Sequence, residues 1–170
     1  EIYSGFNRTG KLFACDWEGV APDIICLGKS LSGGYPISAC VGKAKVIDAW
    51  PESEGEALHT STFLGNPVGC AMAVASLKAH LDNGIQTVVE DASAKLRGKL
   101  GGLSSPLIYE IRGRGLMLGM ELRHEDGSAA GDVAGEVLSK MMQQGVFMLA
   151  DGAEGNVLAF TPPFVISDEE

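Results

Sequence analysis

Lys29 is the first residue whose surroundings indicate chemistry. It follows an apolar run and precedes two glycines in the stretch LGKSLSGGYP, residues 27–36. When a lysine ammonium is drawn into a low-dielectric site it loses solvation and its pKa falls, and the free amine can then attack a carbonyl and form a Schiff base. Glycines on both sides suit a backbone that approaches a flat ligand closely. The local pattern by itself favours the simpler alternative, a lysine at a strand end with its ammonium in solvent.

A second candidate is the stretch HTSTFLGNP, residues 59–67, in which three hydroxyl residues precede the expected start of a helix. Free backbone N–H groups and the helix dipole at such a start favour a bound anion. Taken alone, the segment is also typical of a plain N-cap and turn. Combined with Lys29, a Schiff-base amine and a phosphate-binding segment are what pyridoxal phosphate needs.

Gly113, Gly115 and Gly119 invite comparison with a dinucleotide-binding loop. Their spacing differs from the G-x-G-x-x-G pattern, and no helix is expected directly after them. A turn between two antiparallel strands is the preferred interpretation.

The apolar periodicity predicts a mixed α/β chain around these residues. Ile24–Leu27 is an apolar run without alternation, typical of a strand buried on both faces of a parallel sheet. Pro67 and the alanine-rich run after it predict a helix that ends at Asn83-Gly84. A change of composition near residue 84 indicates a boundary between 1–83 and 84–170. Further strands are expected at 37–41, 107–112, 116–122, 146–149 and 157–160, and further helices at 43–50, 85–100 and 132–144.

Composition narrows the class of protein. The net charge of −9 argues against nucleic acid or an anionic membrane surface as a partner. No segment approaches the roughly 20 apolar residues of a membrane span, and the first ten residues lack the features of a signal peptide. The cysteines and the three histidines are scattered, which favours reduced thiols in a cytoplasmic protein and argues against a metal site. The cysteines are Cys15, Cys26, Cys40 and Cys70.

Five segments together resemble the class III, pyridoxal-phosphate-dependent aminotransferases, the group that includes ornithine and 4-aminobutyrate aminotransferases. They occur in the family's order, and the resemblance extends from residue 1 to residue 170. It implies an α/β fold of the fold type I, aspartate aminotransferase-like class. In it, 1–83 is the C-terminal part of the cofactor-binding large domain and 84–170 is a small α+β C-terminal domain, truncated before its last helix. The segments are EIYSGFNRTGKLFA, PDIICLGKSLSGGYPISA, HTSTFLGNPVGCAMA, IRGRGLMLGMEL and NVLAFTPPFVIS.

The resemblance implies roles for individual residues. Lys29 matches the family's Schiff-base lysine, which also moves the proton of the 1,3-prototropic shift. Thr62, with Ser61 beside it, matches the position that contacts the cofactor phosphate in the partner subunit's site, which implies a homodimer with shared sites. Tyr3 falls where many members have a glutamine near the cofactor's ring hydroxyl, so it departs from the family's pattern.

Parts of the family's site are expected outside this chain. The aspartate that pairs with the pyridinium nitrogen belongs immediately before Glu1. The glycine-serine phosphate loop and the aromatic residue that stacks on the ring belong further upstream. The family's closing helix belongs after Glu170, so both ends look cut. The chain is therefore expected to be the C-terminal part of a longer enzyme.

A further departure concerns the substrate. Ornithine and 4-aminobutyrate aminotransferases have a carboxylate-binding arginine three residues before the Pro162-Pro163 pair, where this chain has Ala159. An alanine offers neither charge nor hydrogen-bond donor, which favours an amine or ω-amino substrate, or a carboxylate held from elsewhere. Arg112 and Arg114 are alternative anion ligands, but charged residues at a turn are usually solvated.

These features predict transfer of an amino group from a primary amine or ω-amino acid to a 2-oxo acid, with pyridoxal 5'-phosphate as the cofactor. Racemase, mutase and decarboxylase reactions use the same lysine and stay open. A second hypothesis is a catalytically inactive fragment that self-associates because its apolar surface is exposed.

Overall fold

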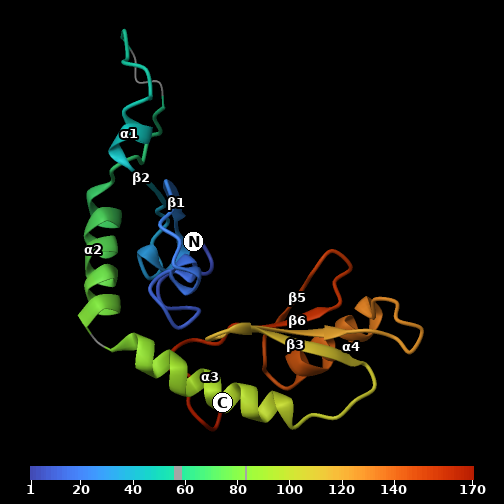
Figure 1. Cartoon of the computed structure of the whole chain (residues 1–170). Helices are drawn as coiled ribbons and strands as arrows, with labels where there is room; N and C mark the ends of the chain where they lie inside the picture. Colours follow the sequence, from blue (N-terminus) through green and yellow to red (C-terminus); the bar gives the residue numbers. More distant parts are fainter. Residues whose placement is uncertain (56–58, 83) are drawn as a thin grey trace. The chain divides into compact units, whose positions relative to one another are not determined.

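The structure, a computed structural model, describes residues 1–55, 59–82 and 84–170. The chain divides into two compact units, Glu1–Gln86 and Thr87–Glu170 (Figure 1). Their assignment to a cofactor-binding and a C-terminal domain stays a prediction. In chain order the elements are η1 (Ala14–Glu18), β1 (Ile24–Leu27), η2 (Lys29–Leu31), β2 (Ala39–Gly42), α1 (Ala44–Ile47), α2 (Pro67–Asp82), α3 (Ile85–Gly101), β3 (Ile108–Arg114), β4 (Met117–Leu122), α4 (Gly131–Gln143), β5 (Leu149–Asp151) and β6 (Val157–Phe160).

The first unit is built around two antiparallel strands and one long helix. Strands β1 and β2 pair with Leu27 opposite Ala39. Leu27 then joins Phe6, Leu31 and Ala73 in a small core, in which Ala73 comes from α2. Phe6 is fully buried, so this core removes one large aromatic side chain from water.

The prediction for β1 is right in its bounds, whereas its pairing with β2 is antiparallel instead of parallel. The strand covers Ile24–Leu27 as expected, but it pairs antiparallel with β2 and buries one face. Leu27 is 7% exposed, whereas Ile24 is 48% exposed. Successive side chains of a strand point to opposite faces, and in the described part of the first unit the core covers only the face of Leu27. Burial of the second face stays a prediction.

Helix α2 begins at the predicted Pro67, and the side chain of Asn66 caps it. Asn66 Oδ1 accepts hydrogen bonds from the N–H groups of Val68 and Gly69, at 3.0 and 3.2 Å. An asparagine cap of this kind stabilises a helix by about 1 kcal/mol. Of the helices that the structure describes, none is both long and apolar enough to cross a membrane.

The chain returns from β1 to β2 through residues 28–38, and this segment starts with an unusual backbone. Lys29 has φ 43°, in the left-handed region that residues with a side chain rarely adopt. This conformation costs roughly 1–2 kcal/mol, so neighbouring contacts must hold it. Leu31 is buried in the core, and Ser76 Oγ on α2 donates a hydrogen bond to the Ser30 carbonyl over 2.7 Å. These two contacts fix the segment directly after Lys29.

The second unit is a four-stranded antiparallel sheet in the order β3-β4-β6-β5. Strand β4 alternates, so that Leu118, Met120 and Leu122 all point to one face. Leu100 of α3 and Ala134 of α4 pack against that face. The amphipathic helix predicted at 132–144 is therefore α4, and its apolar side covers the sheet.

The glycine motif of the second unit is a hairpin turn, as predicted. Gly113 pairs with Leu118 across β3 and β4 and has φ 121°. A Cβ atom at Gly113 would lie 2.1 Å from the Met117 carbonyl oxygen, so only glycine fits there. Strand β5 differs from its prediction, because pairing with β6 starts at Leu149 opposite Ala159, three residues after the expected start.

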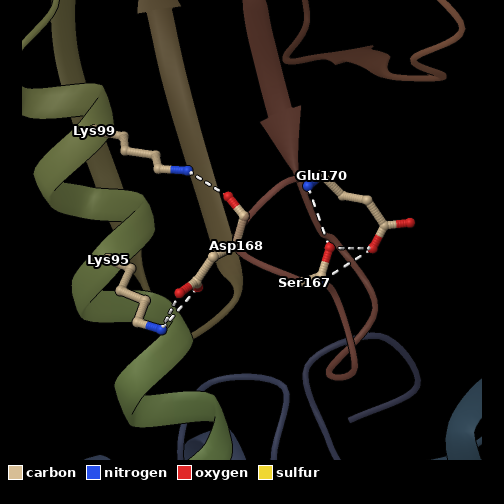
Figure 2. A network of polar contacts seen from close by, with 5 residues as sticks. All are labelled: Lys95, Lys99, Ser167, Asp168 and Glu170. Atoms are coloured by element: carbon tan, nitrogen blue, oxygen red, sulfur yellow. Dashed lines mark hydrogen bonds and ion pairs between the residues drawn. The ribbon is translucent and has the colours of Figure 1, made fainter.

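The last residues of the chain are held on α3 (Figure 2). Lys95 Nζ lies 2.7 Å from Asp168 Oδ1, and Lys99 Nζ donates to the Asp168 carbonyl oxygen over 3.2 Å. Ser167 and Glu170 exchange the two hydrogen bonds of a capping box, from Ser167 N to Glu170 Oε2 and from Glu170 N to Ser167 Oγ. The ion pair is exposed, so salt will weaken it.

The backbone at Lys29 yields the first prediction. Lys29→Gly relieves the left-handed conformation and Lys29→Ala retains it, so the glycine variant should be more stable by about 1 kcal/mol. Both tryptophans, Trp17 and Trp50, lie in the first unit, so tryptophan fluorescence during urea unfolding measures the stability of that unit. An alanine variant as stable as the glycine variant would show that Lys29 is unstrained.

His80 yields a prediction about pH. Burial lowers the pKa of His80, and the charge of Arg8 lowers it further. Folded His80 is therefore neutral at pH values where the unfolded residue takes up a proton. The unfolding free energy of the first unit should fall as the pH decreases from about 6.5 towards the lowered pKa. Tryptophan fluorescence should show that His80→Gln removes this component and that His59→Gln, at an exposed position, retains it. Identical pH profiles for wild type and His80→Gln would contradict the burial argument.

Candidate functional site

Lys29 and Tyr3, which sequence reasoning assigned to one site, lie side by side in the structure. Lys29 Nζ is 4.6 Å from the centre of the Tyr3 ring. Both side chains are exposed, and Tyr3 retains 40% of its accessible surface. An ammonium over an aromatic face is attracted by the ring quadrupole, so Tyr3 orients the lysine without burying it. The result is an accessible primary amine beside an aromatic ring that carries a hydroxyl group.

The backbone around Lys29 is closely packed although its side chain is exposed. A Cβ atom at Gly28 would lie 3.2 Å from Ile2 Cγ2, so the glycine before Lys29 permits a close approach of the N-terminal segment. The Leu31 N–H donates to the Gly28 carbonyl over 2.9 Å and closes the short η2 turn. The position of the amine is therefore set by a fixed backbone, and the flexible part is the side chain.

Sequence reasoning missed two residues that contribute to this site. Ser76 on α2 holds the Ser30 carbonyl, and its sequence context in a helix of small residues gave no sign of this contact. Arg8 interacts electrostatically with Tyr3, while burial lowers the pKa of its guanidinium. Lys29 lies over the Tyr3 ring and Arg8 interacts with Tyr3 electrostatically, so two positive charges act on this residue, which suits an anionic ligand. In the sequence, Arg8 is followed by Thr9-Gly10, which is typical of a simple turn and gave no sign of this interaction.

Ser61 and Thr62 lie in an exposed turn before α2. The Leu64 N–H donates to the Ser61 carbonyl over 3.2 Å within this turn. Within the described ranges, neither hydroxyl forms a hydrogen bond with Lys29 or Tyr3. The roles of Ser61 and Thr62 stay predictions.

The free amide groups expected at the start of α2 are already used. The N–H of Asn66 donates to the Phe63 carbonyl, Pro67 has no N–H, and Asn66 Oδ1 accepts from the next two residues. The expectation that free N–H groups at this helix start favour an anion is therefore wrong. The N-cap-and-turn alternative describes the backbone here, because Asn66 acts as the cap.

In the second unit, Ala159 lines a pocket of about 590 Å³. Most of the pocket wall is apolar, with contributions from Phe147, Leu149 and Phe160, and Glu170 is the one charged residue among the described residues that line the pocket. Arg112 is engaged elsewhere, since its Nη1 donates to Glu121 Oε2 over 2.5 Å and to Glu110 Oε2 over 3.2 Å. Among the described residues that line it, the pocket beside Ala159 thus has no positively charged side chain with which to hold a carboxylate.

The residues around Lys29 fit the covalent anchor of pyridoxal phosphate. The cofactor needs an accessible primary amine at a fixed position, and Lys29 supplies it. Tyr3 offers a hydroxyl, and Arg8 adds positive charge. For the phosphate, the described residues offer the hydroxyls of Ser61 and Thr62 and no free amide groups at the start of α2.

Comparison with known proteins agrees with these features. The family model described as "Aminotransferase class-III" matches residues 1–170. The ornithine aminotransferase of Brevibacillus brevis is 39% identical over all of this chain, which covers 39% of the relative's length. The solved structure of the ornithine aminotransferase from Toxoplasma gondii is 41% identical in sequence to this chain and has a TM-score of 0.81. The match covers all of this chain and 39% of the Toxoplasma chain. The structure of a phospholyase from Arthrobacter in complex with phosphoethanolamine is 28% identical in sequence to this chain and has a TM-score of 0.87. The match covers 99% of this chain and 40% of the Arthrobacter chain.

The chain therefore spans about two fifths of the length of these relatives. Its mixed α/β structure is a fragment of the fold type I architecture, which the family uses to bind pyridoxal phosphate. The accessible lysine beside Tyr3, the five sequence segments and the match over the whole chain agree. The chain belongs to the class III aminotransferases.

Proposed function

We propose that the whole protein transfers an amino group from a primary amine or ω-amino acid to a 2-oxo acid, with pyridoxal phosphate anchored on Lys29. The observation that carries this proposal is the placement of Lys29. Its amine is accessible, its strained backbone is fixed by packing, and it lies 4.6 Å from the ring of Tyr3. Backbone strain of this kind is concentrated at functional sites, because it persists only where the surrounding structure enforces it.

Each residue has a distinct task in this proposal. Lys29 holds the cofactor covalently and, once released, carries the proton between two carbon atoms of the reacting amine and cofactor. Tyr3 positions the Lys29 ammonium and offers its hydroxyl to the cofactor ring. When bound, the cofactor would supply an electron sink for the reaction. Ser61 and Thr62 donate hydrogen bonds to the phosphate in the site of a partner subunit.

An absorbance experiment tests the role of Lys29. The full-length protein with added pyridoxal phosphate should show a band at roughly 400–430 nm, and Lys29→Ala should abolish both the band and transamination. Lys43→Ala is the matched control, because Lys43 is an exposed lysine of the same unit that pairs with Asp23. A band that survives in Lys29→Ala would refute the assignment.

Ala159 and its pocket support an amino donor that lacks a carboxylate near this position. The pocket wall is apolar and its charged lining residue, Glu170, would repel a carboxylate. The Arthrobacter phospholyase provides a chemical parallel, since its structure contains phosphoethanolamine, an amine without a carboxylate. We therefore favour an amine donor over the ornithine named for the Brevibacillus and Toxoplasma relatives.

A substitution at Ala159 tests this specificity. Ala159→Arg should raise kcat/KM for 4-aminobutyrate relative to butylamine by about tenfold or more, because a charge-assisted hydrogen bond to the carboxylate is gained. Ala159→Met adds similar length without charge and should leave the ratio unchanged. Glu170→Gln in the Ala159→Arg background removes an acidic competitor for the arginine. An unchanged ratio in both arginine variants would place carboxylate recognition elsewhere.

The segment after Thr62 supports a homodimer with shared sites. Phe63 and Leu64 are adjacent and expose 75% and 64% of their surface. Adjacent large apolar side chains with this exposure mark an interaction surface. A second copy of the protein that covers them would receive Thr62 at its own site.

Subunit mixing tests the shared site. Lys29→Ala and Thr62→Ala should each be impaired alone, whereas mixed dimers contain one site with both native residues. After subunit exchange, activity should recover to about a quarter of the wild-type value, since about half of the dimers are mixed and each has one intact site. Thr60→Ala in place of Thr62→Ala is the control and should be active by itself. Absence of recovery in mixed dimers of confirmed composition would contradict sharing.

A second candidate is an inactive polypeptide that self-associates through the same apolar surface. The exposure of Phe63 and Leu64 favours it as well. The two candidates differ in chemistry, because only the enzyme forms an amino acid from a 2-oxo acid. A racemase or mutase that uses Lys29 would show the absorbance band without net amino transfer.

A further inference from the structure

The side chain of Glu1 connects the N-terminal turn to the short helix η1. Its Oε2 accepts a hydrogen bond from Ser4 Oγ over 2.5 Å, and its Oε1 accepts one from the Cys15 N–H over 3.0 Å. Hydrogen bonds to a charged acceptor are roughly twice as strong as those between neutral groups. One carboxylate therefore holds the turn and the helix together.

The backbone of residues 1–5 closes into a tight turn around Tyr3. The Gly5 N–H donates to the Glu1 carbonyl over 3.1 Å. A Cβ atom at Gly5 would lie 2.6 Å from the same carbonyl oxygen, so the two ends of the turn meet as closely as a glycine permits. Tyr3 is the middle residue of this turn, and its ring therefore moves with the backbone that Glu1 holds.

The same turn lies against the backbone at Lys29. Ile2 Cγ2 is 3.2 Å from the place that a Cβ atom of Gly28 would occupy, and Lys29 Nζ is 4.6 Å from the centre of the Tyr3 ring. These contacts join described residues of the first unit. They do not depend on which surfaces of that unit a longer protein covers.

We propose that Glu1 is a positioning residue, which holds the Tyr3 ring over the Lys29 amine. The proposal rests on the proposed function, because it concerns the amine that would anchor the cofactor. Loss of the carboxylate would release Ser4 and Cys15, so the turn could shift and carry the ring away from Lys29. The cation–π attraction that orients the amine requires the ring within about 6 Å, and it would then be lost.

Asp16 provides a matched comparison. Its Oδ2 accepts a hydrogen bond from the Phe13 N–H over 3.0 Å at the start of the same helix η1. Its partner lies outside the turn of residues 1–5. If Glu1 served only to cap η1, removal of Asp16 and removal of Glu1 would have the same effect on Lys29.

The ring-current effect of Tyr3 on Lys29 tests this role in the full-length protein without cofactor. Reductive methylation with isotope-labelled formaldehyde makes the lysine amines visible by NMR, and the Lys29 signal is the one that Lys29→Arg lacks. The Tyr3 ring should shift this signal upfield, and Tyr3→Leu should remove the shift. Glu1→Ala should remove most of the shift. Asp16→Ala should retain it, and so should Glu1→Gln, whose side chain can still accept from Cys15 and pair with Ser4.

Three results would overturn the proposal. They are a Lys29 signal that Tyr3→Leu leaves unchanged, a full upfield shift in Glu1→Ala, and equal losses in Glu1→Ala and Asp16→Ala. Circular dichroism identifies folded variants. If Glu1→Ala is unfolded, Ser4→Ala replaces it, because this change removes only the bond to Oε2, and a full shift in Ser4→Ala would equally overturn the proposal. Failure of the proposed function is a separate result, since the absorbance band of Lys29→Ala reports it and the NMR shift is measured without cofactor.

Discussion

The proposed chemistry depends on the backbone conformation of a single residue. Lys29 adopts a left-handed conformation directly after strand β1, and burial of Leu31 together with the hydrogen bond from Ser76 to Ser30 keeps it there. A strained backbone conformation persists only while the contacts around it contribute more stabilising free energy than the strain costs. In the proposed function, the small core of Phe6, Leu27, Leu31 and Ala73 fixes the point from which the amine extends.

The proposed specificity for the amino donor depends on the pocket beside Ala159 in the second unit. In the second unit the antiparallel sheet places Ala159 opposite Gly119 on one neighbour and Leu149 on the other. The described side chains that line the pocket at these positions are small or apolar and include no cation, whereas Arg112 is engaged by carboxylates of the sheet. Family membership thus agrees with a common reaction, while the residues of this pocket favour a particular class of donor.

The sequence predicted the features that depend on local interactions. Pro67 and Asn66 set the start of α2, and glycines at 113 and 115 set the hairpin turn, because caps and turns involve only near neighbours. The antiparallel pairing of β1 with β2 could not be predicted, since an apolar run does not reveal the direction of the neighbouring strand. Local sequence patterns also gave no sign that Lys29 approaches Tyr3, because tertiary packing creates this contact. This pair was expected only from the motifs of the family.

The central claim is that Lys29, among all the lysines of the chain, carries the cofactor. The most direct measurement is borohydride reduction of the full-length protein with pyridoxal phosphate, followed by mass spectrometry of its peptides. A reduced cofactor adduct on Lys29 at a stoichiometry near one per chain is the predicted result. Adducts distributed over exposed lysines such as Lys43 and Lys95, with Lys29 unmodified, would contradict it.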